Sequence, residues 1–137
     1  MRSMPLFDIP SEKALTVRQP WAHLIAVGIK KIENRTWQTN FRGVLYIHAG
    51  SKMHETSMDQ INQKFGLDVK PEQLTFSAII ARVDLVDIIS RSDDPFFEGP
   101  YGWVFENTQI LKPFPLSGKM GLFDLSSSTV NQIRSSL

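Results

Sequence analysis

The chain has 137 residues, of which 42% are hydrophobic and 21% are charged, as is typical of one globular domain. It contains no cysteine, which excludes disulfide scaffolds, thiolate zinc sites and cysteine nucleophiles. The formal net charge is +1, but residues 1–52 carry a balance of +5 and the remainder carries −4. A basic half of this kind can contact phosphates, unless the opposite charges simply mix in three dimensions.

Residues 1–12 contain two prolines and two acids and have no apolar core of a secretory signal, so we expect a leader without periodic structure. The longest apolar runs, 24–27 and 44–47, are far shorter than a membrane span. We therefore expect a cytoplasmic protein that does not enter a membrane. The three histidines show no metal-ligand spacing, and the sequence implies neither a metal nor an organic cofactor.

The first half of the chain alternates short strands and helices. Residues 13–18 alternate apolar and polar side chains and predict a strand. Pro20 at a first helical position and Gly28 as a stop predict a short helix between them. If residues 30–37 are extended, then Lys31, Glu33, Arg35 and Trp37 share one face. Residues 44–50 predict a buried strand, and a helix capped by Ser51 is expected to end at Gly66.

The second half contains longer strands. Residues 76–89 are rich in β-branched side chains and predict a bent or bulged strand, followed by an acidic loop over 90–100. Residues 102–111 predict another strand, whereas the prolines in 112–121 predict irregular structure. A short strand at 122–125 and a helix within 127–137 complete the chain. Because irregular segments separate most strands, we predict an α+β fold: a small, mostly antiparallel barrel with two or three helices outside.

The densest group of charges follows the first predicted helix, in the segment Gly28-Ile29-Lys30-Lys31-Ile32-Glu33-Asn34-Arg35-Thr36-Trp37. One interpretation is an exposed edge strand whose charges block aggregation, with weak surface ion pairs. The other is the floor of a ligand cleft. Arg18 and Gln19 lie between strand and helix, where polar side chains often face a ligand. Trp21 and Trp37 are candidate platforms for stacking a base.

Residues 18–49 resemble the ASCH domain, the homology domain of activating signal cointegrator proteins. The family signature G-x-K-x-x-E-x-R is present as Gly28, Lys30, Glu33 and Arg35. The preceding QPW, the following F-R-G-x-L-x-I-H-A and the segment 114–125 also match the pattern. The resemblance implies an ASCH domain over residues 13–126 and a separate segment at 127–137.

The resemblance implies a PUA-like barrel with a cleft beside it, and binding of RNA, of a modified nucleoside or nucleotide, or of DNA. In this interpretation the binding residues are Arg18, Gln19, Trp21, Lys30, Glu33, Arg35 and Trp37. Glu33 would accept a hydrogen bond from the exocyclic amine of cytosine or adenine, and Lys30 would contact a phosphate or an oxyanion.

Two alternatives remain open. Some small bacterial members are hydrolases, and one group resembles an amidohydrolase that deacetylates N(4)-acetylcytidine with a lysine and a threonine three residues later. In this sequence the lysine falls on Lys30, but Glu33 occupies the threonine position. If the protein is an enzyme, Lys30 and Glu33 are therefore the expected catalytic residues. The second alternative is a protein-interaction module in transcription coregulation, in which the charges only solvate the surface.

Overall fold

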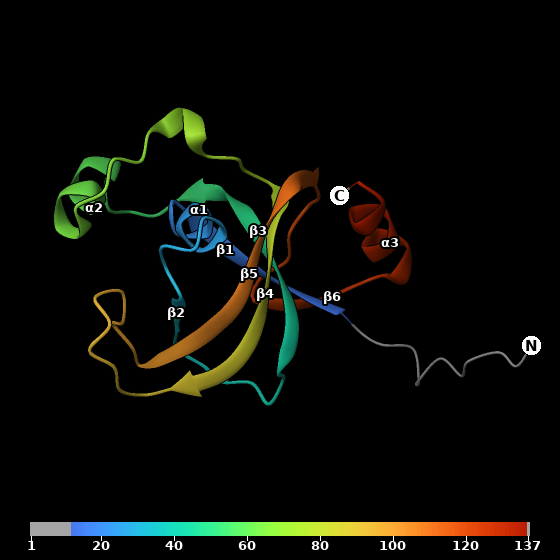
Figure 1. Cartoon of the computed structure of the whole chain (residues 1–137), viewed down its shortest axis with the longest axis horizontal. Coiled ribbons are helices and arrows are strands. Elements are labelled where there is room, and N and C mark those ends of the chain that lie inside the picture. Colours follow the sequence, from blue (N-terminus) through green and yellow to red (C-terminus); the bar gives the residue numbers. More distant parts are fainter. Residues whose placement is uncertain (1–11, 137) are drawn as a thin grey trace, which may run out of the picture.

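A computed structural model describes residues 12–136 of the protein (Figure 1). These residues form strands, α-helices and one short 3-10 helix. In chain order they are β1 (Glu12–Gln19), α1 (Trp21–Ala26), β2 (Ile32–Arg35), β3 (Gly43–Met53), α2 (Met58–Phe65), η2 (Pro71–Gln73), β4 (Ala78–Ile89), β5 (Tyr101–Pro115), β6 (Leu122–Leu125) and α3 (Ser127–Ser135). The predicted leader lies outside the described residues, except that Glu12 begins β1.

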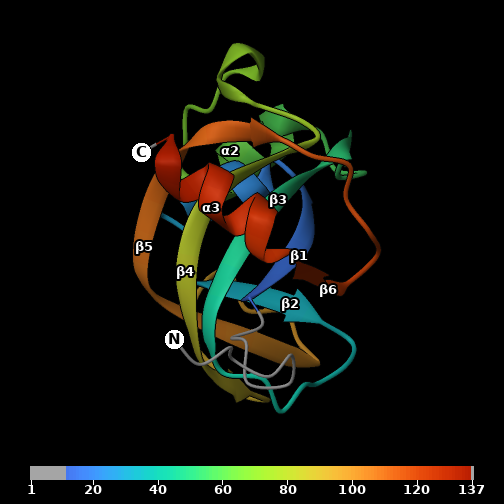
Figure 2. The same ribbon diagram turned by 90° about the vertical axis from the view of Figure 1, so that its right-hand side faces the viewer.

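The six strands form one mixed sheet in the order β2-β5-β4-β3-β1-β6. The β1–β3 pair is parallel, and every other neighbouring pair is antiparallel. This arrangement confirms the predicted α+β, mostly antiparallel fold. Figure 2 shows how strongly the sheet curves. The curve stops short of a closed barrel, because β2 and β6 are the two edges of the sheet in the part of the chain described.

The curvature comes mainly from the two longest strands. The β4–β5 ladder shifts register between Ile79 and Ala81 and again further along the pair. Each irregularity bends the strand and increases its twist, as the length of the 76–89 pattern predicts. The bend brings β2, which pairs with the start of β5, round toward β1 at the other side of the sheet.

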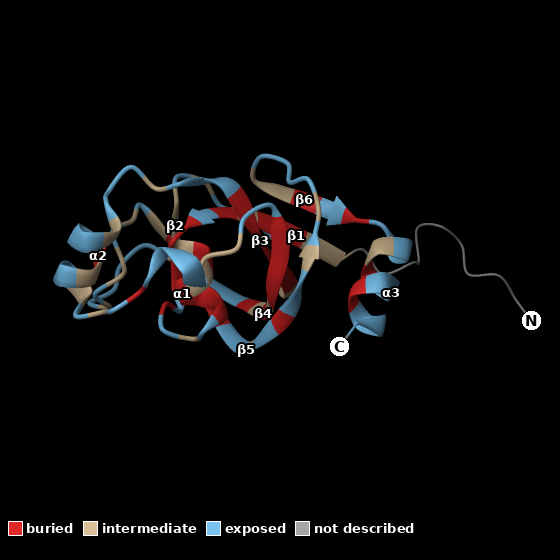
Figure 3. Cartoon of the chain, turned by 90° about the horizontal axis from the view of Figure 1, so that it is seen from above, coloured by how far each residue is buried: buried red, intermediate tan, exposed pale blue. Residues whose placement is uncertain are grey.

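Both faces of the central strands are buried (Figure 3). Ala14 and Leu15 are neighbours on β1, so they point to opposite faces, yet each is 0% exposed. On one face Leu15 packs in a cluster with Trp103 and residues of α1. On the other face Ala14 packs with Tyr46 and with residues of α3. Helices on both sides of the sheet therefore explain why these strands bury apolar side chains on both faces.

Two predicted helix boundaries are wrong. Pro20 is the N-cap of α1 rather than its first helical residue, and its carbonyl accepts a bond from the Leu24 N–H at 3.1 Å. Ser51 belongs to β3, and α2 is capped by Ser57, whose hydroxyl accepts a bond from the Gln60 N–H at 3.2 Å. A serine followed three residues later by glutamine forms a capping box, which satisfies backbone donors at both positions.

The prediction of irregular structure over 112–121 is wrong for its first part, since β5 continues to Pro115. Proline removes a donor from a strand and is tolerated where no ladder bond is needed. Here β2 pairs only with the first residues of β5, up to Val104, and leaves the outer edge of the later residues without a neighbouring strand. The segment that follows, 116–121, is irregular as predicted.

Candidate functional site

A pocket of about 760 Å³ lies beside β2. Its lining comes from β1, β2, α1, α2, the 90–100 loop and the turn before β6. In Figure 1, α2 and the loop between β4 and β5 project from the same side of the sheet. The pocket therefore combines segments that are far apart in the sequence, and its volume is in the range that holds small ligands.

A row of three charged side chains lies at the floor of the pocket. Lys30 Nζ is 3.0 Å from Glu33 Oε1, and Arg35 Nη2 is 2.9 Å from Glu33 Oε2. Lys30 is 3% exposed and Glu33 is 7% exposed, so the pair is shielded from water. Such a pair needs its other polar atoms satisfied, and Lys30 also donates to the Ile32 carbonyl. Both carboxylate oxygens of Glu33 are therefore held in place by cations.

Lys30 reaches this row because it precedes the regular strand. Its backbone N–H donates to the Leu24 carbonyl at 3.0 Å, in the turn after α1. Alternation along residues 30–37 predicted that Lys31 would share a face with Glu33, and this detail is wrong. Lys31 is exposed and does not line the pocket, because β2 begins only at Ile32.

Arg35 connects β2 to β1, two strands that do not pair. Its Nη2 donates to the Thr16 carbonyl at 2.7 Å, so this side chain spans the open side of the curved sheet. The Nε of Arg35 is buried and has no acceptor among the described residues. Buried donors without partners are uncommon in folded proteins. This one belongs to a residue that lines the pocket.

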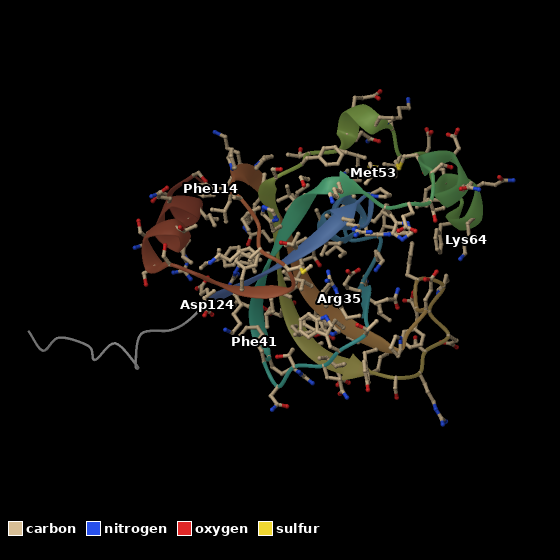
Figure 4. All side chains as sticks on the ribbon, turned by 180° about the vertical axis from the view of Figure 1, so that it is seen from behind. Arg35, Phe41, Met53, Lys64, Phe114 and Asp124 are labelled. Carbon is tan, nitrogen blue, oxygen red and sulfur yellow. The ribbon has the colours of Figure 1, made fainter. Side chains whose placement is uncertain are left out.

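The rim of the pocket is more exposed than its floor and is also basic. Arg18 is exposed and makes no ion pair with any described side chain. Lys64 Nζ is 3.6 Å from Glu98 Oε1, but both side chains are about two-thirds exposed, so the pair is weak. Figure 4 shows Arg35 near the middle of the molecule and Lys64 at its outer edge. Floor and rim together have four cations and two carboxylates.

An aromatic wall, formed by Trp21, Phe65 and Phe96, joins floor and rim. Phe65 and Phe96 stack with their centroids 4.3 Å apart, and Trp21 meets Phe65 edge to face at 6.1 Å. The Trp21 ring also lies 5.7 Å from Lys30 Nζ and 5.4 Å from the His54 ring. All five residues line the pocket, which gives a flat ligand an apolar surface beside the buried charges.

Asn34 holds the 90–100 loop against the pocket. Its Nδ2 donates to the Phe96 carbonyl at 2.8 Å, and its Oδ1 accepts from the N–H groups of Glu98 and Gly99 at 2.8 and 3.1 Å. One side chain on β2 thus satisfies three backbone groups of the loop. The position of Phe96 in the aromatic wall depends directly on these bonds.

The structure brings most of the predicted binding residues together. Six of them line the pocket: Arg18, Trp21, Lys30, Glu33, Arg35 and Trp37. Gln19 does not, because it is 0% exposed and its amide bonds the Thr75 carbonyl at 2.7 Å and the His23 N–H at 2.9 Å. Gln19 therefore anchors α1 and the loop before β4, and we do not retain it as a ligand contact.

Several pocket residues were missed from the sequence: Asn34, His54, Lys64, Phe65, Phe96 and Glu98. In the sequence Phe65 is only one of several apolar residues at helical spacing, and such spacing is equally typical of core packing. The pair Phe96 and Phe97 was a usable signal, since two adjacent aromatic residues are unusual in an acidic, proline-containing loop. Asn34 lies within the signature, between Glu33 and Arg35, but an uncharged side chain at that place gives no separate indication of a binding role.

Two groups outside the pocket lining have a shifted pKa. Partial burial lowers the pKa of His23 below its usual value. Burial raises the pKa of Tyr46, and a hydrogen bond to Glu12 raises it further. Among residues 12–136, no three histidine, aspartate or glutamate side chains are placed to hold a metal ion. None of the helices described has the length and apolar character needed to cross a bilayer.

A family model, the ASCH domain, matches residues 15–111. The chain belongs to the ASCH domain family. The match contains the signature residues Gly28, Lys30, Glu33 and Arg35, three of which line the pocket. The ASCH signature is therefore, in this protein, mainly the sequence of a pocket floor.

Curated relatives support the family assignment. Activating signal cointegrator 1 from Homo sapiens is 32% identical over 128 residues, covering 82% of this chain. Its counterpart from Mus musculus is 33% identical over 128 residues, with the same coverage. The chain spans only 22% of the length of either relative.

Solved ASCH structures confirm the PUA-like fold. The ASCH protein from Zymomonas mobilis has a TM-score of 0.56 and 15% identity, covering 90% of this chain and 94% of that one. A variant of the same protein has a TM-score of 0.59 and 14% identity, covering 92% of this chain and 98% of that one. At this level of identity the likeness concerns the fold alone.

Replacing Lys30 by alanine is expected to lower the free energy of unfolding by about 2–4 kcal/mol, because Glu33 then loses one of its two cations in a buried site. Lys31→Ala is the matched control, since Lys31 is adjacent but exposed, and a change within about 0.5 kcal/mol is expected there. Urea unfolding of the three proteins measures the difference. Equal midpoints for the two variants would show that the Lys30–Glu33 pair does not stabilise the fold.

Replacing Asn34 by alanine is expected to release the 90–100 loop while the sheet stays folded, because three loop hydrogen bonds lose their common partner. Hydrogen exchange at the amides of Glu98 and Gly99 should become faster, whereas exchange in β4 should not change. Asn40→Ala, at an exposed position outside the pocket, is the control. Unchanged protection of the two loop amides would contradict this role for Asn34.

Proposed function

We propose that the protein binds single-stranded RNA, with one segment of the strand held in this pocket. The observation that carries the proposal is the combination of four cationic side chains with an aromatic wall in one cavity. Proteins that bind single strands combine a positive groove for the backbone with aromatic groups for the bases. The ASCH family is generally associated with nucleic-acid binding, which agrees with this chemistry.

The charge distribution indicates that the floor and the rim of the pocket contact different parts of the RNA. The floor cations Lys30 and Arg35 are paired with Glu33, so little of their charge is available to a phosphate. Arg18 is not paired and is exposed at the rim, and Lys64 shares only a weak surface contact with Glu98. Backbone phosphates are therefore expected to contact the rim. Trp37 also lines the pocket and is half-buried, and its ring packs perpendicular to that of Trp103 with the centroids 4.8 Å apart.

Hydrolysis has less support from the same geometry. A general base takes up a proton, and protonation of Glu33 would remove the charge with which both neighbouring cations are paired. The only other carboxylate among the residues that line the pocket, Glu98, lies at the exposed rim, where it contacts Lys64 at 3.6 Å. A role in transcription coregulation is the second alternative. It is suggested only by the names of relatives of which this chain spans 22%.

The salt dependence of RNA binding tests the proposal. A fluorescein-labelled single-stranded RNA of mixed sequence is titrated with the protein at several salt concentrations. Binding should weaken with salt, and Arg18→Ala should reduce the slope of log K against log salt by about 0.7, the value for one lost contact on a single strand. Arg91→Ala is the control, because Arg91 is exposed but outside the pocket.

Three measurements test RNA binding against the alternatives. No binding to RNA, or equal slopes for the wild type and Arg18→Ala, would overturn the proposal for this pocket. The RNA recovered after the titration is also analysed by mass spectrometry, and cleaved product would favour the hydrolase alternative. A competing DNA of the same sequence measures how far the 2′-hydroxyl contributes to binding.

A further inference from the structure

The connection between β5 and β6, residues 116–121, reaches the pocket and is here called the strap. Figure 2 shows it descending on the right from β5 to β6. Its tip consists of Met120 and Gly121, which both line the pocket. Met120 is 95% exposed, and no hydrogen bond joins its backbone to another described residue. A single exposed apolar side chain is common on protein surfaces, so Met120 is informative only together with the way the strap is held.

The base of the strap packs against a buried histidine. His48, on β3, is 2% exposed, and its Nε2 donates to the Leu116 carbonyl, since a carbonyl can only accept. Phe123 meets the ring edge to face, with the centroids 6.1 Å apart. The backbone of Gly118 lies directly against the same ring, because a Cβ there would be 2.4 Å from His48 Cε1. The approach of the strap to His48 therefore requires glycine at this position.

Thr16, on β1, joins the strap to the floor of the pocket. Its hydroxyl donates to the Lys119 carbonyl at 2.8 Å and lies 3.2 Å from His48 Nδ1. Its backbone N–H donates to the Gly121 carbonyl at 3.4 Å. Its own carbonyl accepts the bond from Arg35 Nη2 at 2.7 Å. One residue therefore contacts the strap through its hydroxyl and N–H, and the charged floor through its carbonyl.

These contacts divide the strap into a fixed base, 116–119, and a free tip. Side chains of two strands hold the base, whereas the tip has only one long backbone bond among the described residues. We infer that the strap closes on RNA in the pocket: His48 and Thr16 hold its base, and the Met120 side chain folds over the bound segment. Methionine is unbranched and flexible, and its thioether packs favourably against aromatic rings.

The inference rests on the proposed function and adds the element that covers the ligand. His48 does not line the pocket, so its part is that of a positioning residue. It acts through the strap, whose tip it places beside the pocket.

Nuclear magnetic resonance of the methionine methyl groups tests the closure. The full chain is labelled with carbon-13 at these methyls, and the signal lost in Met120→Ala identifies Met120. Saturating single-stranded RNA of mixed sequence should move this signal upfield, because the methyl then lies over the face of a base. The Met53 methyl is the control and should not move, since Met53 is 37% exposed and outside the pocket.

The affinity for the same RNA measures what the tip contributes. Met120→Ala should bind about fivefold more weakly, which is within the range for one thioether contact with an aromatic ring. The slope of log K against log salt should not change, because no phosphate contact is lost. Met53→Ala should bind like the wild type.

A variant at the base of the strap tests whether the base must be fixed. Gly118→Ala places a methyl group against the His48 ring and should lift the strap. Hydrogen exchange at the Thr16 amide should become faster while exchange in β4 stays unchanged, and RNA should no longer move the Met120 signal. Ser117→Ala, exposed in the same segment, is the control and should change neither measurement.

Variants of His48 separate positioning from a general loss of stability. His48→Ala should have the same effects as Gly118→Ala. His48→Gln should largely keep the wild-type behaviour, because a glutamine amide can still donate to the Leu116 carbonyl. Circular dichroism shows whether each variant is folded, and Gly118→Ala decides the role of the base if His48→Ala is not.

The outcomes separate this inference from the proposed function. RNA binding with an unmoved Met120 signal, or equal affinities of Met120→Ala and Met53→Ala, would overturn closure by the tip and leave RNA binding intact. Unchanged Thr16 exchange in Gly118→Ala, or a wild-type Met120 shift in a folded His48→Ala, would overturn the fixed base. Absence of RNA binding by the wild type would overturn the closure together with the proposed function.

Discussion

The charged row Lys30–Glu33–Arg35 is the constraint on which the pocket depends. A carboxylate that is 7% exposed is costly unless cations and donors surround it, and here two cations contact its two oxygens. The same interaction sets the local backbone, because Lys30 also donates to the carbonyl of Ile32 at the start of β2. Arg35 extends the row to the Thr16 carbonyl on β1. One buried network therefore pairs the charges of the floor and links the two sides of the curved sheet.

The walls of the pocket follow from this floor. Asn34, between Glu33 and Arg35, bonds three backbone groups of the 90–100 loop, and the loop then presents Phe96 to Phe65 on α2. A four-residue strand thus organises the floor through its charged side chains and one wall through its amide. This division explains how a short edge strand can control a cavity whose other parts lie far away in the sequence.

The family match identifies the family and the fold, and the geometry of the pocket supports the proposed function. The ASCH match and the solved ASCH structures establish the family and the PUA-like fold. The proposed RNA binding depends on what the pocket contains, namely unpaired charge at the rim, paired charge at the floor and an aromatic wall between them. The paired state of Glu33 also weighs against a role as a general base, because protonation would leave Lys30 and Arg35 without their counter-charge. Binding is the function that uses all of these features together.

The sequence alone determined the α+β class, the order of the strands along the chain and the candidate residues around Glu33, since these depend on local periodicity and on the spacing of a short signature. It failed at Ser51, where β3 continues beside β1, and at Pro113, where the strand edge has no neighbour, because both depend on residues distant in the chain. Only the tertiary structure decided that Gln19 is buried away from the pocket and that Phe65 meets Phe96. Those contacts arise where the curved sheet brings α2 and the 90–100 loop to the same side of β2, which no local pattern encodes.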